Sequence, residues 1–209
     1  MIETRRVVCW RHGRTAWNLE NRFQGQTDIP LDATGVAQAE RAAHLLAALH
    51  PSAIIASDLS RAAETAGMLA RQTGLSPHYD KGLRERHGGE WEGLTSTEIR
   101  QRWPDEDTRM EIPGGEELAS VGERVVEAID RGLATVPENG ILVVVSHGAA
   151  LRSGITRMLG LSPEKRGILG PLDNCSWSVL GPVTLGEGWR LLEHNAGTLP
   201  GERVLSDDR

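Results

Sequence analysis

The chain contains a run of five apolar residues, Ile141 to Val145, four of which are β-branched. A continuous run of this kind, without polar alternation, is typical of a central parallel strand that is buried on both faces. Neighbouring parallel strands are joined by long crossovers, which are usually helices. The rest of the chain is therefore expected to supply further strands and helices in alternation.

The hydrophobic pattern elsewhere supplies that alternation. Arg5–Trp10 and Ala53–Ser57 are short apolar runs that predict two more strands. The other predicted elements are a helix that starts near Asp32 or Thr34 and runs to Leu49, helices over Leu59–Gln72 (with Gly74 as the stop), from Leu118 to before Pro137 and over about Ala149–Leu159, and strands over Ser176–Leu180 and Trp189–Glu193. The predicted fold class is α/β, with three layers: a mostly parallel central sheet and helices on both faces.

Composition narrows the class of protein. The chain has 209 residues, which suits one domain, and a formal net charge of −6, which speaks against nucleic-acid binding. No apolar stretch approaches the roughly 18 residues of a membrane helix, and no signal peptide is recognisable. Because Cys9 and Cys175 are the only cysteines, we expect buried or free thiols and a cytoplasmic location. Residues 104–116 and the tail after Thr198 are expected to be irregular.

Histidines and arginines follow the predicted strands. Arg11 and His12 directly follow the first strand, Arg61 lies shortly after the second, and His147 directly follows the central strand. In open α/β sheets, ligands bind outside the carboxyl ends of the strands. A single histidine or arginine in such a place is usually structural, but two His-Gly pairs at the ends of strands in one sheet favour a site.

These residue types suit phosphoryl transfer. A neutral imidazole attacks phosphorus and forms a phosphohistidine that water later hydrolyses. Arginine groups stabilise the charge of the transferring phosphoryl group, and a carboxylic acid protonates the leaving oxygen. Glu85, Glu90 and Glu92 lie in one glycine-interrupted segment, and chemistry alone does not choose among them.

The sequence lacks the motifs of metal sites, nucleotide-binding loops and serine hydrolases. The seven histidines show no HxH, HExxH or HxxxH spacing, and neither cysteine is in a CxxC, so no metal site is predicted. The chain also lacks a GxxxxGK[ST] loop, a GxGxxG fingerprint and a GxSxG elbow. We therefore expect neither a metal nor another cofactor.

Six segments together resemble the histidine phosphatase superfamily, which has the phosphoglycerate-mutase-like fold. The segments are RHGRTAWN (11–18), FQGQTDIPLDATGVAQA (23–39), SDLSRAAETA (57–66), LRERHGGEWEGL (83–94), PGGE (113–116) and SHGAALR (146–152). The resemblance covers about residues 6–195. It implies a single histidine phosphatase domain over residues 1–198, with 87–117 as a segment that caps the pocket and 199–209 as a frayed tail.

The resemblance also implies a role for each matching residue. His12 is the expected phosphorylated nucleophile, and Glu85 is the expected proton donor, which leaves Glu90 and Glu92 with structural roles. The expected phosphate pocket is formed by Arg11, Arg61 and His147. The residues expected to line the phosphate and substrate are Asn18, Gln24 and Gly25.

The phosphatase branch of the superfamily fits better than the mutase branch. The cofactor-dependent mutases carry a tyrosine in a Glu-Arg-His-Tyr-Gly run, where this chain has Gly88, and they have a longer basic insert than 95–112. The stretch LDNCSWSVL (172–180) resembles broad-specificity and glucosyl-3-phosphoglycerate phosphatases. The expected activity is metal-independent hydrolysis of a small sugar or glycerate phosphomonoester.

Three alternatives stay open at this stage: a phosphoglycerate mutase, an α-ribazole phosphatase and, least favoured, a partner-binding pseudophosphatase. Family members are often dimers, so a homodimer is one expectation, and no nucleic acid or membrane partner is expected. The sequence does not decide whether Trp17, Phe23, Trp91 and Trp103 line the pocket or pack in the core.

Overall fold

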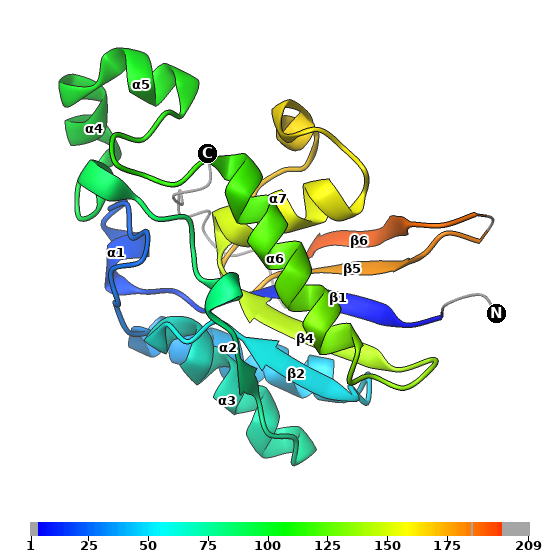
Figure 1. Cartoon of the computed structure of the whole chain (residues 1–209). Helices are drawn as coiled ribbons and strands as arrows, with labels where there is room; N and C mark the ends of the chain where they lie inside the picture. Colours follow the sequence, from blue (N-terminus) through cyan, green and yellow to red (C-terminus); the bar gives the residue numbers. More distant parts are fainter. Residues whose placement is uncertain (1–3, 185, 198–209) are drawn as a thin grey trace.

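The computed structural model describes residues 4–184 and 186–197. One six-stranded sheet, with the order β3-β2-β4-β1-β5-β6, organises the molecule (Figure 1). The strands are β1 (Arg6–Arg11), β2 (Ala53–Ala56), β3 (His78–Tyr79), β4 (Ile141–Ser146), β5 (Trp177–Pro182) and β6 (Trp189–Ala196). The α-helices are α1 (Ala16–Leu19), α2 (Ala33–Ala47), α3 (Ser60–Thr73), α4 (Ser96–Arg102), α5 (Pro104–Arg109), α6 (Leu118–Leu133) and α7 (Gly148–Met158).

The sheet is mixed but mostly parallel, as predicted. Strand β4 lies at its centre and pairs in parallel with β1 on one side and β2 on the other. Strand β3 continues the parallel part, whereas β5 and β6 are antiparallel. The parallel strands therefore direct β1, β2 and β4 to the same edge, where Figure 1 places α1.

Alternate residues of the central strands pack into two separate hydrophobic clusters. On one face, Val144 and Leu142 pack with Val125 and Ile129 of α6 and with α7. On the other face, the odd-numbered valines of β4 pack with the small side chains of α2 and α3. The predicted three layers are thus confirmed, because each face of the sheet is covered by its own pair of helices.

Local signals set the helix ends. Asp32, rather than Thr34, is the N-cap of α2, and its carboxylate accepts a hydrogen bond from Gly35 N at 2.7 Å. Gly74 ends α3 in the left-handed conformation (φ 74°), which a residue without a Cβ adopts at little cost. Both features agree with the sequence prediction.

The expectation of an irregular segment over 104–116 was wrong in part. Helix α5 begins with Pro104 at its first position and carries three acidic residues in its first turn, a favourable arrangement near the positive helix end. Helix α4 before it is closed by a reciprocal capping box between Thr95 and Glu98. Helix α1 has a similar box between Thr15 and Asn18.

The aromatic residues between 17 and 103 mostly pack in a core of their own. Phe23 and Trp91 are buried and meet edge to face, with ring centroids 5.7 Å apart. Trp103 packs against the same cluster, together with Ile99 and Ile112. Trp17 is partly buried and is not in that cluster.

The two cysteines have the state that the sequence predicts. Cys9 and Cys175 are both buried thiols without a disulfide, and burial raises the pKa of each to about 12. Within residues 4–184 and 186–197, no helix has the length and apolar character needed to cross a membrane. The tail after residue 198 lies outside the described residues.

Candidate active site

The two histidines that follow the strands lie side by side. The backbone N–H of His12 donates to Ser146 O at 3.0 Å, which continues the pairing of β1 with β4 by one residue. His147 follows Ser146 directly, so both imidazoles stand at the same edge of the sheet. Their ring centroids are 5.1 Å apart and the rings meet at 60°.

The tautomer of His12 follows from its backbone contact. Its Nδ1 lies 2.7 Å from Gly13 O, and a carbonyl oxygen only accepts, so Nδ1 carries the proton. The lone pair of the neutral ring is therefore on Nε2. Burial, and then the charges of Arg61 and Arg11, hold the pKa of His12 well below its usual range, which keeps the ring neutral.

His147 has a partner at each ring nitrogen. Arg61 Nε donates to His147 Nδ1 at 3.2 Å, so the neutral ring carries its proton on Nε2. That Nε2 lies 2.9 Å from Ser57 Oγ. Burial, followed by the charges of Arg61, His12 and Arg11, also lowers the pKa of His147 well below its usual range.

Arg61 is one of two buried arginines of the site. It is the second residue of α3 and is fully buried. Its Nη2 donates to Gly25 O at 2.7 Å and its Nη1 donates to Thr27 O at 2.9 Å. The loop around Gly25 thus holds the guanidinium in place beside His147.

Arg11 is the last residue of β1 and is almost completely buried. Its Nη1 donates to Leu172 O at 2.5 Å, which ties it to the segment before β5. Asn174, in the same segment, donates from Nδ2 to His12 O at 3.3 Å. The stretch 172–174 therefore supports both residues at the end of β1.

The carboxylate of Glu85 binds the first backbone N–H groups of α7. Its two carboxylate oxygens accept hydrogen bonds from Ala149 N at 3.1 Å and from Ala150 N and Arg86 N at 2.8 Å. Because α7 begins directly after His147, these bonds place the carboxylate next to that histidine. The N-terminus of a helix is a favourable place for a carboxylate.

The two rival carboxylates lie elsewhere. Glu90 is exposed, and Glu92 accepts hydrogen bonds from the backbone of Gln26, Thr27 and Gly88. Glu92 therefore has a structural role, as the resemblance implies, because it binds both the loop at Gln26 and Thr27 and the loop at Gly88.

Asn18 and Gln24 meet around Thr15. Thr15 Oγ1 lies 3.1 Å from Asn18 Oδ1 and 2.9 Å from Gln24 Oε1, and Asn174 Nδ2 lies 3.2 Å from Asn18 Oδ1. In the described part of the chain, the buried Nδ2 of Asn18 has no acceptor. Its two N–H bonds are therefore able to serve a ligand oxygen.

Three residues of the arrangement were not singled out from the sequence. Ser57 contacts His147, Thr65 Oγ1 accepts from Gly13 N at 3.2 Å, and Asn174 contacts both His12 and Asn18. Ser57 alone had a usable signal, since it directly follows β2 at the same sheet edge as the histidines. Thr65 and Asn174 reach the site through tertiary contacts that no spacing predicts.

The comparison with protein families agrees with this geometry. A model described as the histidine phosphatase superfamily (branch 1) matches residues 7–197. The chain belongs to this superfamily.

Similar proteins in the superfamily include phosphatases and mutases. A glucosyl-3-phosphoglycerate phosphatase from Mycolicibacterium vanbaalenii is 33% identical over 98% of this chain and 100% of its own. A 2,3-bisphosphoglycerate-dependent phosphoglycerate mutase from Gloeobacter violaceus is 34% identical over 76% of this chain and 78% of its own. The solved structure of a mycobacterial glucosyl-3-phosphoglycerate phosphatase with VO3 has a TM-score of 0.85 at 35% identity, covering 92% of this chain and 100% of that chain.

Proposed function

We propose that this protein is a phosphatase that hydrolyses a small phosphomonoester through a phosphohistidine on His12. The observation that carries the proposal is the 2.7 Å contact of His12 Nδ1 with Gly13 O, which leaves Nε2 as the nucleophilic atom. This atom belongs to a buried ring beside Arg61 and His147, where a dianionic phosphate is attracted and water is largely excluded.

In the first step, His12 Nε2 attacks phosphorus. The Nε2–P bond forms while the P–O bond to the leaving group breaks. A protonated Glu85 gives its proton to the leaving oxygen, so an alcohol departs rather than an alkoxide.

In the second step, water attacks the phosphohistidine. Glu85, now a carboxylate, takes a proton from the water, and the N–P bond breaks. Inorganic phosphate leaves, and both His12 and Glu85 return to their starting forms.

Positive and N–H groups stabilise the phosphoryl charge during both steps. Arg11 and Arg61 supply guanidinium groups, and His147 supplies the Nε2–H that lies 2.9 Å from Ser57 Oγ. Since these groups meet the phosphoryl charge themselves, we propose that no metal takes part.

The substrate is proposed to be a sugar or glycerate phosphate, because similar proteins are named glucosyl-3-phosphoglycerate phosphatases. Asn18, Gln24 and Gly25 are proposed to line the phosphate, and residues 87–117 to cap the pocket. A homodimer and a cytoplasmic location stay predictions.

Gly88 favours the phosphatase over the mutase. A Cβ at this position would lie 2.7 Å from the ring of Phe23, which is buried against Trp91, and 2.7 Å from Glu92. Contacts this short do not occur in well-packed proteins. The tyrosine that the mutases carry here would therefore need the aromatic cluster to rearrange.

The test is phosphate release from a panel of phosphomonoesters in EDTA, with 3-phosphoglycerate isomerisation followed in parallel. The panel includes glucosyl-3-phosphoglycerate, sugar phosphates, α-ribazole phosphate, phosphoserine and p-nitrophenyl phosphate. We expect net phosphate release that EDTA does not inhibit. Isomerisation without net release would show a mutase instead.

A further inference from the structure

Asn195, near the end of β6, has an uncommon backbone conformation. Its φ is 53°, in the left-handed region, which asparagine tolerates better than most residues. The pairing of β5 with β6 shifts register here, and Ser178 Oγ contacts both His194 Nδ1, at 2.9 Å, and Asn195 N, at 3.4 Å. Two residues of β6 thus oppose one residue of β5, which is the arrangement of a β-bulge. Because bulges redirect side chains, the side chain of Asn195 is directed out of the strand ladder.

The side chain of Asn195 holds the turn 173–176, which precedes β5. Its Oδ1 accepts from Asp173 N at 2.7 Å and lies 2.6 Å from Ser176 Oγ, and its Nδ2 donates to Asp173 Oδ2 at 3.0 Å. A backbone N–H only donates and a carboxylate only accepts, so these contacts fix the orientation of the amide. One side chain therefore holds both ends of the turn.

The same turn holds the end of β1. Cys175 N donates to His12 O at 3.1 Å, and Asn174 Nδ2 lies 3.3 Å from the same oxygen. Directly before the turn, the carbonyl oxygen of Leu172 accepts from Arg11 Nη1 at 2.5 Å. The position of the turn therefore affects both the backbone of His12 and the guanidinium of Arg11.

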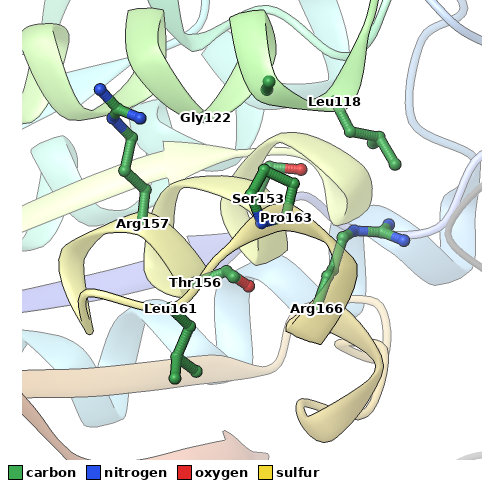
Figure 2. A pocket seen from close by; sticks show the side chains of 9 residues that line it. Leu118, Gly122, Ser153, Thr156, Arg157, Leu161, Pro163 and Arg166 are labelled. Carbon is green, nitrogen blue, oxygen red and sulfur yellow. The ribbon is translucent and has the colours of Figure 1, made fainter.

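The chain that leads into the turn is not closely packed along its whole length. The 3₁₀-helix η3 (Pro163–Ile168) encloses a pocket together with α6 and α7, which holds about 300 Å³ of space, open solvent included. Figure 2 shows Leu118 of α6 on one side of this pocket and Leu161 on the other. Leu172 is buried in the core and holds one end of the following segment, while the hydrogen bonds from β6 hold the rest.

We propose that Asn195 is a positioning residue, which acts on Arg11 and His12 through the turn 173–176. Phosphoryl transfer depends on aiming the nucleophile and the charged groups at phosphorus, and a misplacement of about 1 Å costs about 100-fold in rate. The antiparallel edge of the sheet thus contributes to the site at the carboxyl ends of the parallel strands. This inference rests on the proposed function for the roles of Arg11 and His12.

The variant Asn195→Asp tests the contact with Asp173. It keeps an acceptor for Asp173 N, but an oxygen replaces the N–H₂ that faces Asp173 Oδ2, so two carboxylates meet. We expect inorganic phosphate to bind about 10-fold more weakly in titration calorimetry, and kcat/KM for p-nitrophenyl phosphate to fall about 10-fold. Both are measured well below the unfolding temperature, which is determined for every variant.

Adding Asp173→Asn to this variant reverses the pair. The new amide at position 173 then donates to the new carboxylate at position 195, and the net charge of the unmodified protein is restored. The phosphate affinity and kcat/KM should both return to within about 3-fold of the original values, as expected for restoring one hydrogen bond. This rescue separates the contact from a general effect of added charge.

Leu191→Ala is the control for general weakening of β6. Leu191 pairs with Leu180 and packs against the core, four residues before Asn195. Its replacement should lower the unfolding temperature but change neither phosphate affinity nor kcat/KM. Asn195→Gly keeps the left-handed backbone and removes only the amide group, so it should show the same losses as Asn195→Asp and replaces that variant if it does not fold.

Three results would overturn the proposal. These are unchanged phosphate affinity and kcat/KM in the folded Asn195 variants, a folded double variant that stays impaired, and an equal loss in Leu191→Ala. Since the proposed function is tested by phosphate release from the unmodified enzyme, the two can fail separately.

Discussion

Single hydrogen bonds decide which ring nitrogen of His12 and of His147 carries the proton. Gly13 O accepts a hydrogen bond from His12 Nδ1–H, whereas Arg61 Nε donates one to the lone pair of His147 Nδ1. At Nε2 the two rings therefore have opposite properties, a lone pair on His12 and an N–H on His147 that lies against Ser57. This difference arises from backbone and arginine contacts, so it does not depend on bound ligand.

Replacement of Ser57 by alanine should remove the hydrogen bond that holds the ring of His147 in position. In Ser57→Ala the buried Nε2–H of His147 loses its partner, which is expected to cost about 1–3 kcal/mol of folding stability. We also expect turnover to fall about 10-fold, the change that corresponds to about 1.4 kcal/mol. Urea unfolding, steady-state kinetics and the ¹⁵N-coupled imidazole proton signal of His147 measure these effects.

Ser57→Thr keeps the hydroxyl and is the matched control. It should restore the imidazole proton signal and most of the turnover. If the alanine and threonine variants behave alike, the hydroxyl does not position His147.

The role of Glu85 predicts a dependence on the leaving group. Glu85→Gln removes the proton donor, so esters of poor leaving groups should slow by about 100-fold or more. Aryl phosphates, whose leaving groups depart without a proton, should slow much less. The measurement is kcat/KM for a sugar phosphate and for p-nitrophenyl phosphate, and equal slowing of both would argue against Glu85 as the acid.

At the level of elements, one carboxylate joins the loop around Gln26 to the segment that follows η2. Glu92 follows the short 3₁₀-helix η2 (Gly89–Trp91) and accepts hydrogen bonds from Gln26 N at 2.9 Å and from Thr27 N at 3.0 Å. The same loop holds Arg61 through the carbonyl of Thr27. Glu92 thus supports the loop that holds Arg61.

The variant Glu92→Gln should therefore loosen that loop. An amide group would turn an N–H₂ toward backbone donors, and we expect a loss of about 1–3 kcal/mol in the free energy of unfolding. The KM for phosphate esters should rise because Arg61 loses its support. Urea unfolding and steady-state kinetics measure both.

Glu90→Gln is the control for this change. Glu90 is exposed and lies two residues away in the same segment. Its replacement should change neither quantity, and a Glu92 variant that behaves like it would contradict the anchoring role.

The elements that the sequence predicted well are those with strong local signals. The apolar run of β4 and the helices bounded by Asp32 and Gly74 lie close to where they were expected. The short helices α1, α4 and α5 were missed because they have few residues and no clear hydrophobic period. Capping boxes stabilise α1 and α4. The aromatic cluster around Trp91 includes Ile99 of α4 and the two residues that cap α5, Trp103 and Met110.

Only part of the candidate site could be predicted from the residues without the resemblance. The rule that ligands bind at the carboxyl ends of parallel strands located Arg11, His12, Arg61 and His147, and the structure brings these four together. The choice of Glu85 over its neighbours came only from resemblance, because a loop carries no periodic signal.

On the scale of the whole molecule, two neutral histidines are buried beside arginines. Both pKa values are held well below the usual value of about 6.5, whereas the unfolded chain binds protons normally. As the pH falls below about 6.5, the unfolded state takes up protons that the folded state does not. The folded protein is therefore destabilised by acid, starting at a higher pH than carboxylate titration would cause.

The expected size of this effect is measurable. With both histidines contributing, the free energy of unfolding should fall with a slope that approaches about 2.7 kcal/mol per pH unit between pH 6.5 and 5. In His12→Asn the slope should drop by about half. Urea unfolding in buffers without phosphate provides the values, and a flat profile over this range would mean that the histidines are not buried as neutral groups.

If the phosphoryl group passes through Nε2 of His12, a phosphohistidine can be trapped at that residue during turnover. The enzyme is mixed with a rapidly hydrolysed phosphomonoester in EDTA, quenched in base within milliseconds, and digested for mass spectrometry. We predict an acid-labile phosphoryl group on His12 during turnover, and none in His12→Ala, which should also release no phosphate. Phosphate release by His12→Ala, or turnover with a phosphoryl group on another residue, would contradict the mechanism.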